Sequence, residues 1–177
     1  MPKPKVMTAP GPASLAGRVD PVWDRILEEA SEVLRRDVVL GGFISGAIVN
    51  QASLETAVAE RVAARLDHGA VPAHLIAQTF AEAIGKDPSL GDAFRADIMA
   101  VADRDPACTR FIEPLLYFKG FHAIQAYRLA HSLWHQGRKD FALYLQSRSS
   151  EVFQTDVHPA ARIGRGIFLD HATGLVV

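Results

Sequence analysis

Near its C-terminal end this 177-residue chain places an aliphatic side chain at every sixth position. The repeat consists of Val157, Ile163, Leu169 and Leu175. Between them lie small or turn-forming residues, namely Pro159, Gly164, Gly166 and Gly174. A period of six is typical of a parallel β-helix, in which each hexapeptide points one aliphatic side chain inward. The alternative is an ordinary loop and strand. In a chain that is half hydrophobic, four chosen positions are all apolar by chance in about one trial of seventeen, so the repeat alone does not exclude this alternative.

Residues 157–177 amount to about one coil of such a β-helix. A single coil cannot bury its own apolar face, and solenoids need about three or more stacked repeats. The sequence ends on Val176 and Val177, in the middle of the pattern. We therefore expect the first coil of a longer β-helix that is cut short.

The residues before this repeat follow the 3.6-residue period of amphipathic helices. Asp20 and Ser53 are suited to cap two of these helices, and Pro21 is suited to a first helical position. The pattern predicts seven helical segments, at 21–36, 38–49, 54–66, 72–84, 88–101, 119–136 and 139–154. The segment 38–49 is almost all apolar, so a buried strand fits its period equally well, and its helical neighbours favour a short buried helix.

Three parts follow from these patterns. Residues 1–19 are expected to be a disordered tail, 20–155 a helical domain, and 156–177 the start of a β-helix; the family resemblance given below implies that 20–155 is an oligomerisation and substrate domain. The expected fold class is mainly α, with a helical domain followed by the first coil of a β-helix. No fixed repeat length relates the helices, which argues against a helical solenoid.

Composition excludes several classes of function. The chain has 19 Lys and Arg against 20 Asp and Glu, which argues against binding to nucleic acid by phosphate neutralisation. The sequence contains no run of about 18 apolar residues, so no membrane-spanning helix is expected. The basic N-terminus is not followed by the apolar stretch of a secretory signal. The single cysteine, Cys108, rules out an internal disulfide and a zinc site of several thiolates. This usage fits a reducing, cytoplasmic location, and no metal is expected.

Two stretches carry a resemblance to a known family. Residues 114–128 read PLLYFKGFHAIQAYR, and residues 156–166 read DVHPAARIGRG, followed by LDHATG at 169–174. Both resemble signatures of the bacterial serine O-acetyltransferases, and the likeness extends over about residues 20–177. It implies a left-handed β-helix after the helical domain, trimers formed through the β-helices, and hexamers formed through the helical domains. It also implies transfer of acetyl from acetyl-CoA to the hydroxyl of L-serine, giving O-acetylserine for cysteine biosynthesis.

The resemblance assigns roles to four residues. His171 matches the general base, and Asp156 matches the carboxylate that orients its imidazole. The two are 15 residues apart in the sequence, and one full coil takes about 18 residues. The chain therefore returns to nearly the same corner of the coil, so contact between the two side chains is geometrically reasonable. Asp105 and Asp170 match carboxylates that hold the ammonium group of L-serine, and the feedback inhibitor L-cysteine occupies the same place. Such a site would lie where the helices meet the first coil.

Other polar residues receive structural roles. The histidines at 122, 131, 135 and 158 are expected to be structural or solvated, and Lys119 and Arg128 to lie at the surface or between helices. The family builds its CoA site largely from later coils, so no cofactor-binding residue is expected within this chain. The family's further Arg-His pair, and the C-terminal tail that binds O-acetylserine sulfhydrylase, are also absent from it.

We therefore expect a truncated serine O-acetyltransferase with little activity. Two alternatives stay open: a helical oligomerisation module without catalysis, and a hexapeptide acyltransferase that uses another acceptor, such as a sugar or homoserine. The carboxylates of Asp105 and Asp170 would suit an ammonium group and argue against a plain sugar.

Overall fold

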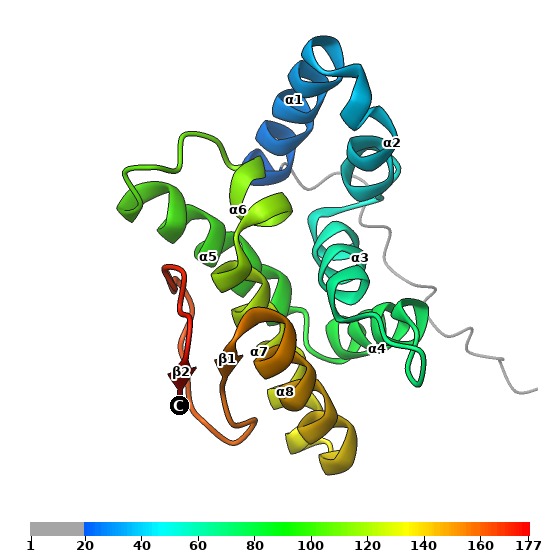
Figure 1. Cartoon of the computed structure of the whole chain (residues 1–177), viewed down its shortest axis with the longest axis vertical. Coiled ribbons are helices and arrows are strands. Elements are labelled where there is room, and N and C mark those ends of the chain that lie inside the picture. The colour runs from blue at the N-terminus through cyan, green and yellow to red at the C-terminus, as the bar shows by residue number, and fades with distance from the viewer. Residues whose placement is uncertain (1–19) are drawn as a thin grey trace, which may run out of the picture.

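A computed structural model describes residues 20–177, and the tail expected at 1–19 lies outside this range. The described residues form eight α-helices followed by one coil of extended chain (Figure 1). The helices are α1 Pro21–Arg36, α2 Gly41–Ile44, α3 Leu54–Leu66, α4 Ala73–Lys86, α5 Ser89–Arg104, α6 Ile112–Tyr117, α7 Lys119–His135 and α8 Lys139–Phe153. A 3₁₀ turn at Val38–Leu40 and a π-helical turn at Ser45–Val49 flank α2. The prediction of a mainly helical protein is confirmed.

Local capping explains where the first helices begin. The side chain of Asp20 accepts a hydrogen bond from the backbone N–H of Trp23 at 3.2 Å, and Pro21 occupies the first turn of α1. Ser53 and Thr56 form a reciprocal capping box at the start of α3. Each cap satisfies backbone donors that have no partner inside the helix, so both predicted helix starts are confirmed.

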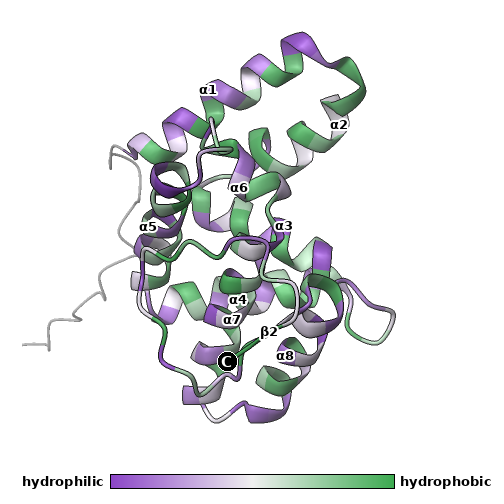
Figure 2. Cartoon of the chain, turned by 60° about the vertical axis from the view of Figure 1, so that its left-hand side comes forward, coloured by the Kyte–Doolittle hydropathy of each residue, from purple (hydrophilic) through white to green (hydrophobic). Residues whose placement is uncertain are grey.

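The segment 38–49 is helical, as predicted, but it is not a buried helix. Val38 and Val39 are 85% and 93% exposed, whereas Ile44 and Ile48 are fully buried. The reason is its position, since α1 and α2 project together from the rest of the molecule as an arm. Figure 2 shows hydrophobic residues at the tip of this arm, where α1 passes into α2. Only the side of the segment that faces α1 and α3 can therefore bury its side chains.

The connector between α5 and α7 contains a helix that the periodicity did not predict. Helix α6 has only six residues, too few to show an apolar period. Pro114 lies in its first turn, where the missing backbone N–H costs no hydrogen bond. The packing of Ile112, Leu115 and Leu116, all fully buried, holds this short helix in place.

Helix α7 passes through the centre of the protein. Twelve of its residues are buried, and it packs against α8 along its length. His122 on α7 is fully buried, and its Nε2–H donates to the carbonyl of Leu115 at 2.8 Å. Burial, together with the charges of Arg61 and Arg65, lowers the pKa of His122 to about 3. The imidazole is therefore neutral in the folded protein, which confirms its structural role.

We expect His122 to make stability fall in acid. The unfolded chain binds a proton at this imidazole below about pH 6.5, whereas the folded protein does not until about pH 3. Stability is therefore lost as the pH falls between these values. Thermal unfolding at about pH 7.5 and about pH 5 should show a smaller loss for His122→Gln than for the wild type. Equal losses in the two proteins would contradict a neutral, buried His122.

The coil begins where α8 ends. Gln154 adopts a left-handed φ of 58°, which turns the chain out of α8 into strand β1, Thr155–Asp156. Strand β1 pairs in parallel with β2, Leu175–Val176, with Thr155 opposite Leu175 and Asp156 opposite Val176. Val157 is buried and the other three members of the six-residue repeat are half-buried. The repeat therefore does form a coil, but one turn takes 20 residues rather than 18.

None of the helices between residues 20 and 177 combines the length and apolar character needed to cross a bilayer.

Candidate active site

Asp156 lies on β1, against helix α8. Its Oδ1 accepts a hydrogen bond from Nε2 of Gln146 at 2.6 Å, and the carboxylate is half-buried. Beside it is an open hollow of about 350 Å³. Its lining consists of Leu143, Gln146, Ser147, Ser150, Glu151 and Asp156. Asp156 is thus oriented by a neighbouring amide and faces space large enough for a small molecule.

Asp170 and His171 lie in the turn that precedes β2. Both are exposed, and Oδ1 of Asp170 is 3.6 Å from Nε2 of His171. His171 and Ala172 have left-handed φ angles of 43° and 54°, which make the turn sharp. The hydroxyl of Thr155 donates to the carbonyl of Ala172 at 3.3 Å. This hydrogen bond places the turn that carries His171 beside the strand that carries Asp156.

The expected contact between His171 and Asp156 is not formed in this structure. Within the described part of the chain, the carboxylate at ion-pair distance from the imidazole is that of Asp170. The longer turn explains the difference, because Val176 lies opposite Asp156 and His171 is five residues earlier. An 18-residue coil would have brought His171 closer to alignment with Asp156.

Asp105 ends helix α5. Its Oδ1 accepts a hydrogen bond from the backbone N–H of Ala107 at 2.8 Å, which forms the turn that breaks the helix before Pro106. The neighbouring Arg104 donates to the carbonyl of Gly166 at 2.9 Å. The end of α5 therefore touches the coil, but no hydrogen bond in residues 20–177 joins Asp105 to the other three candidate residues.

The contacts that dock the coil onto α7 were missed by sequence reasoning. The hydroxyl of Tyr127 donates to the carbonyl of Ala161 at 2.6 Å, and Nδ1–H of His131 donates to that of Pro159 at 2.7 Å. Arg128 lies between helices, one of its two expected positions, where it is buried and paired with Asp97 on α5. The sequence did hold one signal, because Asp97 lies on the apolar stripe of α5 formed by Phe94, Ile98 and Val101.

Comparison with known proteins decides the family. A family model described as "Serine acetyltransferase, N-terminal" matches residues 22–126, more than half of the chain. This chain belongs to the serine acetyltransferase family. The resemblance seen in the sequence is thereby confirmed.

Individual serine acetyltransferases agree with the assignment. "Probable serine acetyltransferase 4" of Oryza sativa subsp. japonica is 46% identical over 170 residues, which are 96% of this chain and 54% of the relative. The crystal structure of serine acetyltransferase in complex with coenzyme A from Brucella abortus strain S19 matches with a TM-score of 0.88 and 59% identity. That match covers 89% of this chain and 63% of the other.

A second solved structure is a complex with cysteine. A serine acetyltransferase in complex with cysteine matches with a TM-score of 0.86 and 44% identity, over 88% of this chain and 64% of that one. The chain spans about half the length of the curated serine acetyltransferases it matches. These comparisons support the fold, a helical domain followed by β-helix, over most of the present chain.

Proposed function

We propose that this chain carries the helical domain and part of the active site of a serine O-acetyltransferase, which makes O-acetylserine from L-serine and acetyl-CoA for cysteine biosynthesis. The observation that carries the proposal is the position of the Asp170–His171 turn beside the Asp156 strand, joined by the Thr155–Ala172 hydrogen bond. This adjacency arises in a chain of the serine acetyltransferase family, whose members bind CoA and cysteine in the matched structures.

His171 is proposed as the general base. The serine hydroxyl is too weak an acid to lose its proton unaided at neutral pH, so the imidazole takes that proton as the oxygen attacks the thioester carbonyl. When the carbon–sulfur bond breaks, the imidazolium returns the proton to the departing thiolate of CoA. The His171 side chain is 89% exposed, which leaves room for both substrates at its ring.

The three carboxylates have distinct proposed roles. Asp156 is held in one orientation by Gln146, and its proposed role is to stabilise the protonated imidazole once the turn moves His171 to β1. Asp105 and Asp170 attract the ammonium group of L-serine, and L-cysteine competes for them as the feedback inhibitor. Asp170 already lies beside the imidazole, so a serine held there has its hydroxyl within reach of the base.

The proposal brings only the thioester end of acetyl-CoA to this turn. The exposed imidazole leaves space for a thioester, and no residue of this chain is assigned to hold the nucleotide part. We place that part of the site in coils that would follow Val177. Sequencing the DNA downstream of the Val177 codon tests this placement. A reading frame that continues with an aliphatic residue at every sixth position supports it, and an immediate stop codon in the gene contradicts it.

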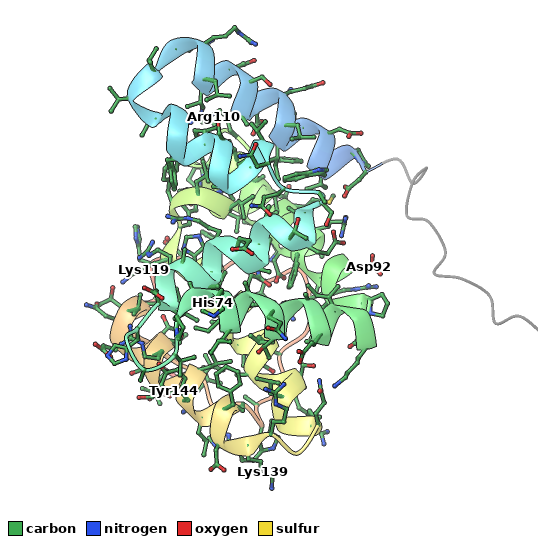
Figure 3. All side chains as sticks on the ribbon, turned by 90° about the vertical axis from the view of Figure 1, so that its right-hand side faces the viewer. His74, Asp92, Arg110, Lys119, Lys139 and Tyr144 are labelled. Carbon is green, nitrogen blue, oxygen red and sulfur yellow. The ribbon has the colours of Figure 1, made fainter. Side chains whose placement is uncertain are left out.

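Substituting the proposed ammonium ligands should weaken L-serine binding. Asp170→Asn and Asp105→Asn each remove one negative charge and are expected to raise the dissociation constant about tenfold or more. Isothermal titration calorimetry with L-serine and with L-cysteine measures the effect. Asp92→Asn is the matched control, because Asp92 is an exposed residue at the other end of α5 (Figure 3).

Unchanged affinity in both Asp105 and Asp170 variants would remove these residues from the site. A wild-type protein that binds neither amino acid, even when extended to the length of its relatives, would overturn the serine assignment. An acetyl-transfer assay on the present chain tests the expectation of little activity, and turnover equal to that of the extended protein would contradict it.

The assembly and surroundings are part of the same proposal. A trimer through the β-helices and a hexamer of two trimers are proposed because the chain belongs to the serine acetyltransferase family. Light scattering measures the oligomer, and a monomer at micromolar concentration would contradict it. A cytoplasmic location agrees with the single cysteine. Binding of O-acetylserine sulfhydrylase would need a segment beyond residue 177.

A further inference from the structure

The carboxylate of Asp97 on α5 is the most buried charge that the proposed reaction does not use. Its exposed fraction is 0%, and helix α7 supplies donors on one side. Arg128 donates from Nε to Oδ2 and from a terminal nitrogen to Oδ1, both at 2.9 Å, in a two-pronged ion pair. Gln125 adds a third donor, with Nε2 at 3.0 Å from Oδ2. Such a pair is costly to bury unless its geometry is specific.

The other side of the same carboxylate holds the coil. The backbone N–H groups of Gly166 and Ile167 both donate to Oδ1 of Asp97, at 2.8 Å and 2.9 Å. Arg128 completes the contact by donating to the carbonyl of Gly164 at 2.8 Å. We name this set, Asp97 with Arg128 on residues 164–167, the Asp97–Arg128 clamp.

The clamp connects the two halves of the candidate site. Asp97 and Asp105 lie on the same helix or at its end, eight residues apart. Ile167, the last residue held by the clamp, is three residues before Asp170. A rigid helix carries one half and a short extended segment carries the other, so the position of the clamp sets the distance between Asp105 and the Asp170–His171 turn.

We propose that Asp97 is a positioning residue: its clamp on residues 164–167 holds Asp170 and His171 in place relative to Asp105. The proposal rests on the function proposed above. Other hydrogen bonds hold the coil on either side of the clamp: Tyr127 and His131 bind Pro159–Ile163, and Thr155 and Lys119 bind Ala172 and Thr173. The clamp differs from them because it binds the segment that leads directly into Asp170. Arg104 alone among the remaining side chains reaches Gly166.

Asp97→Asn tests the proposal with almost no change in volume. An asparagine keeps one acceptor oxygen but turns a donor toward either Arg128 and Gln125 or the N–H groups of Gly166 and Ile167. Glu29→Gln is the matched control. Glu29 is also a buried carboxylate, 3% exposed, and it accepts from Ile112 N–H and Arg25 at the α1–α6 contact, away from the coil. Both variants lose a buried charge, but only one touches residues 164–167.

Limited proteolysis provides a readout that does not depend on activity. Arg165 lies within the clamped segment and is exposed, so trypsin cleaves after it once the segment opens locally. We expect Asp97→Asn to raise the rate of cleavage after Arg165 by about tenfold or more, measured by mass spectrometry, with the helical circular dichroism retained. Arg128→Lys, which keeps the charge but loses the two-pronged geometry, should give an intermediate rate. Glu29→Gln should leave this rate unchanged.

Calorimetry with L-serine gives the second readout. Asp97→Asn should weaken binding about tenfold, as the Asp170 turn loses its position, and Glu29→Gln should not. Equal cleavage after Arg165 in the two variants, or unchanged serine affinity in Asp97→Asn, overturns the positioning role. If the extended wild type binds no L-serine, the proposed function fails. The proteolysis result still decides whether the clamp holds the coil in that case.

Discussion

Asn in place of His171 is expected to lower kcat for acetyl transfer to L-serine by about 10²–10⁴-fold, the contribution typical of a general base. Asparagine is chosen because the φ of 43° at this position favours residues that accept a left-handed backbone. The His171 side chain is 89% exposed, so the fold should survive the change. L-serine should bind nearly as well as in the wild type, because the proposed ammonium ligands remain.

The control for this variant is His74→Asn. His74 is exposed on α4, far in the chain from the coil (Figure 3), and its replacement should leave kcat unchanged. Steady-state kinetics measure the effect. They are carried out in whichever protein shows turnover, either the present chain or the chain extended to the length of its relatives. A His171→Asn protein with wild-type kcat would remove His171 from the reaction and leave the proposal without a base.

Alanine in place of Gly120 is expected to displace the candidate site from a distance. A Cβ at this position would lie 1.9 Å from the carbonyl oxygen of Leu169 and 2.9 Å from its carbonyl carbon. Both are backbone atoms of the residue that precedes Asp170, so the coil itself must move away from α7. Overpacking of this kind costs about 1–3 kcal/mol of folding free energy. We also expect weaker L-serine binding and lower kcat.

Gly85→Ala is the matched control for this glycine. Gly85 lies near the end of α4, and a Cβ there would meet no atom within 4 Å. Alanine is the better helix former, so this variant should be more stable by about 0.5–1 kcal/mol. Urea unfolding compares the two proteins. A Gly120→Ala protein as stable as the wild type, with unchanged serine affinity, would show that the close packing of α7 on the coil is unimportant.

Much of the helical domain could be predicted from local sequence. The caps at Asp20 and Ser53 and the apolar stripes that follow them depend on residues within one or two helical turns. The exposed tip at Val38 and Val39 could not be predicted in this way. An apolar run shows that a segment has hydrophobic side chains, but the neighbouring elements determine how many of them are covered.

The candidate site was also predicted only in part from the sequence. Motif resemblance was enough to select Asp105, Asp156, Asp170 and His171, and the six-residue repeat was enough to predict a coil. The spacing alone led to the expectation of a His171–Asp156 contact. The structure instead pairs His171 with Asp170, because one turn of this coil takes 20 residues.

By itself the sequence indicated every helical segment except α6, the change to a coil near residue 155, and the resemblance to the family. Those properties arise from short-range patterns that a single segment carries. Only the tertiary structure showed that Gly120 packs on the backbone of Leu169 and that Asp97 and Arg128 hold residues 164–167. These contacts join segments that are about 40 to 70 residues apart in the chain. A buried ion pair and a missing Cβ acquire their meaning only when packing brings their partners together.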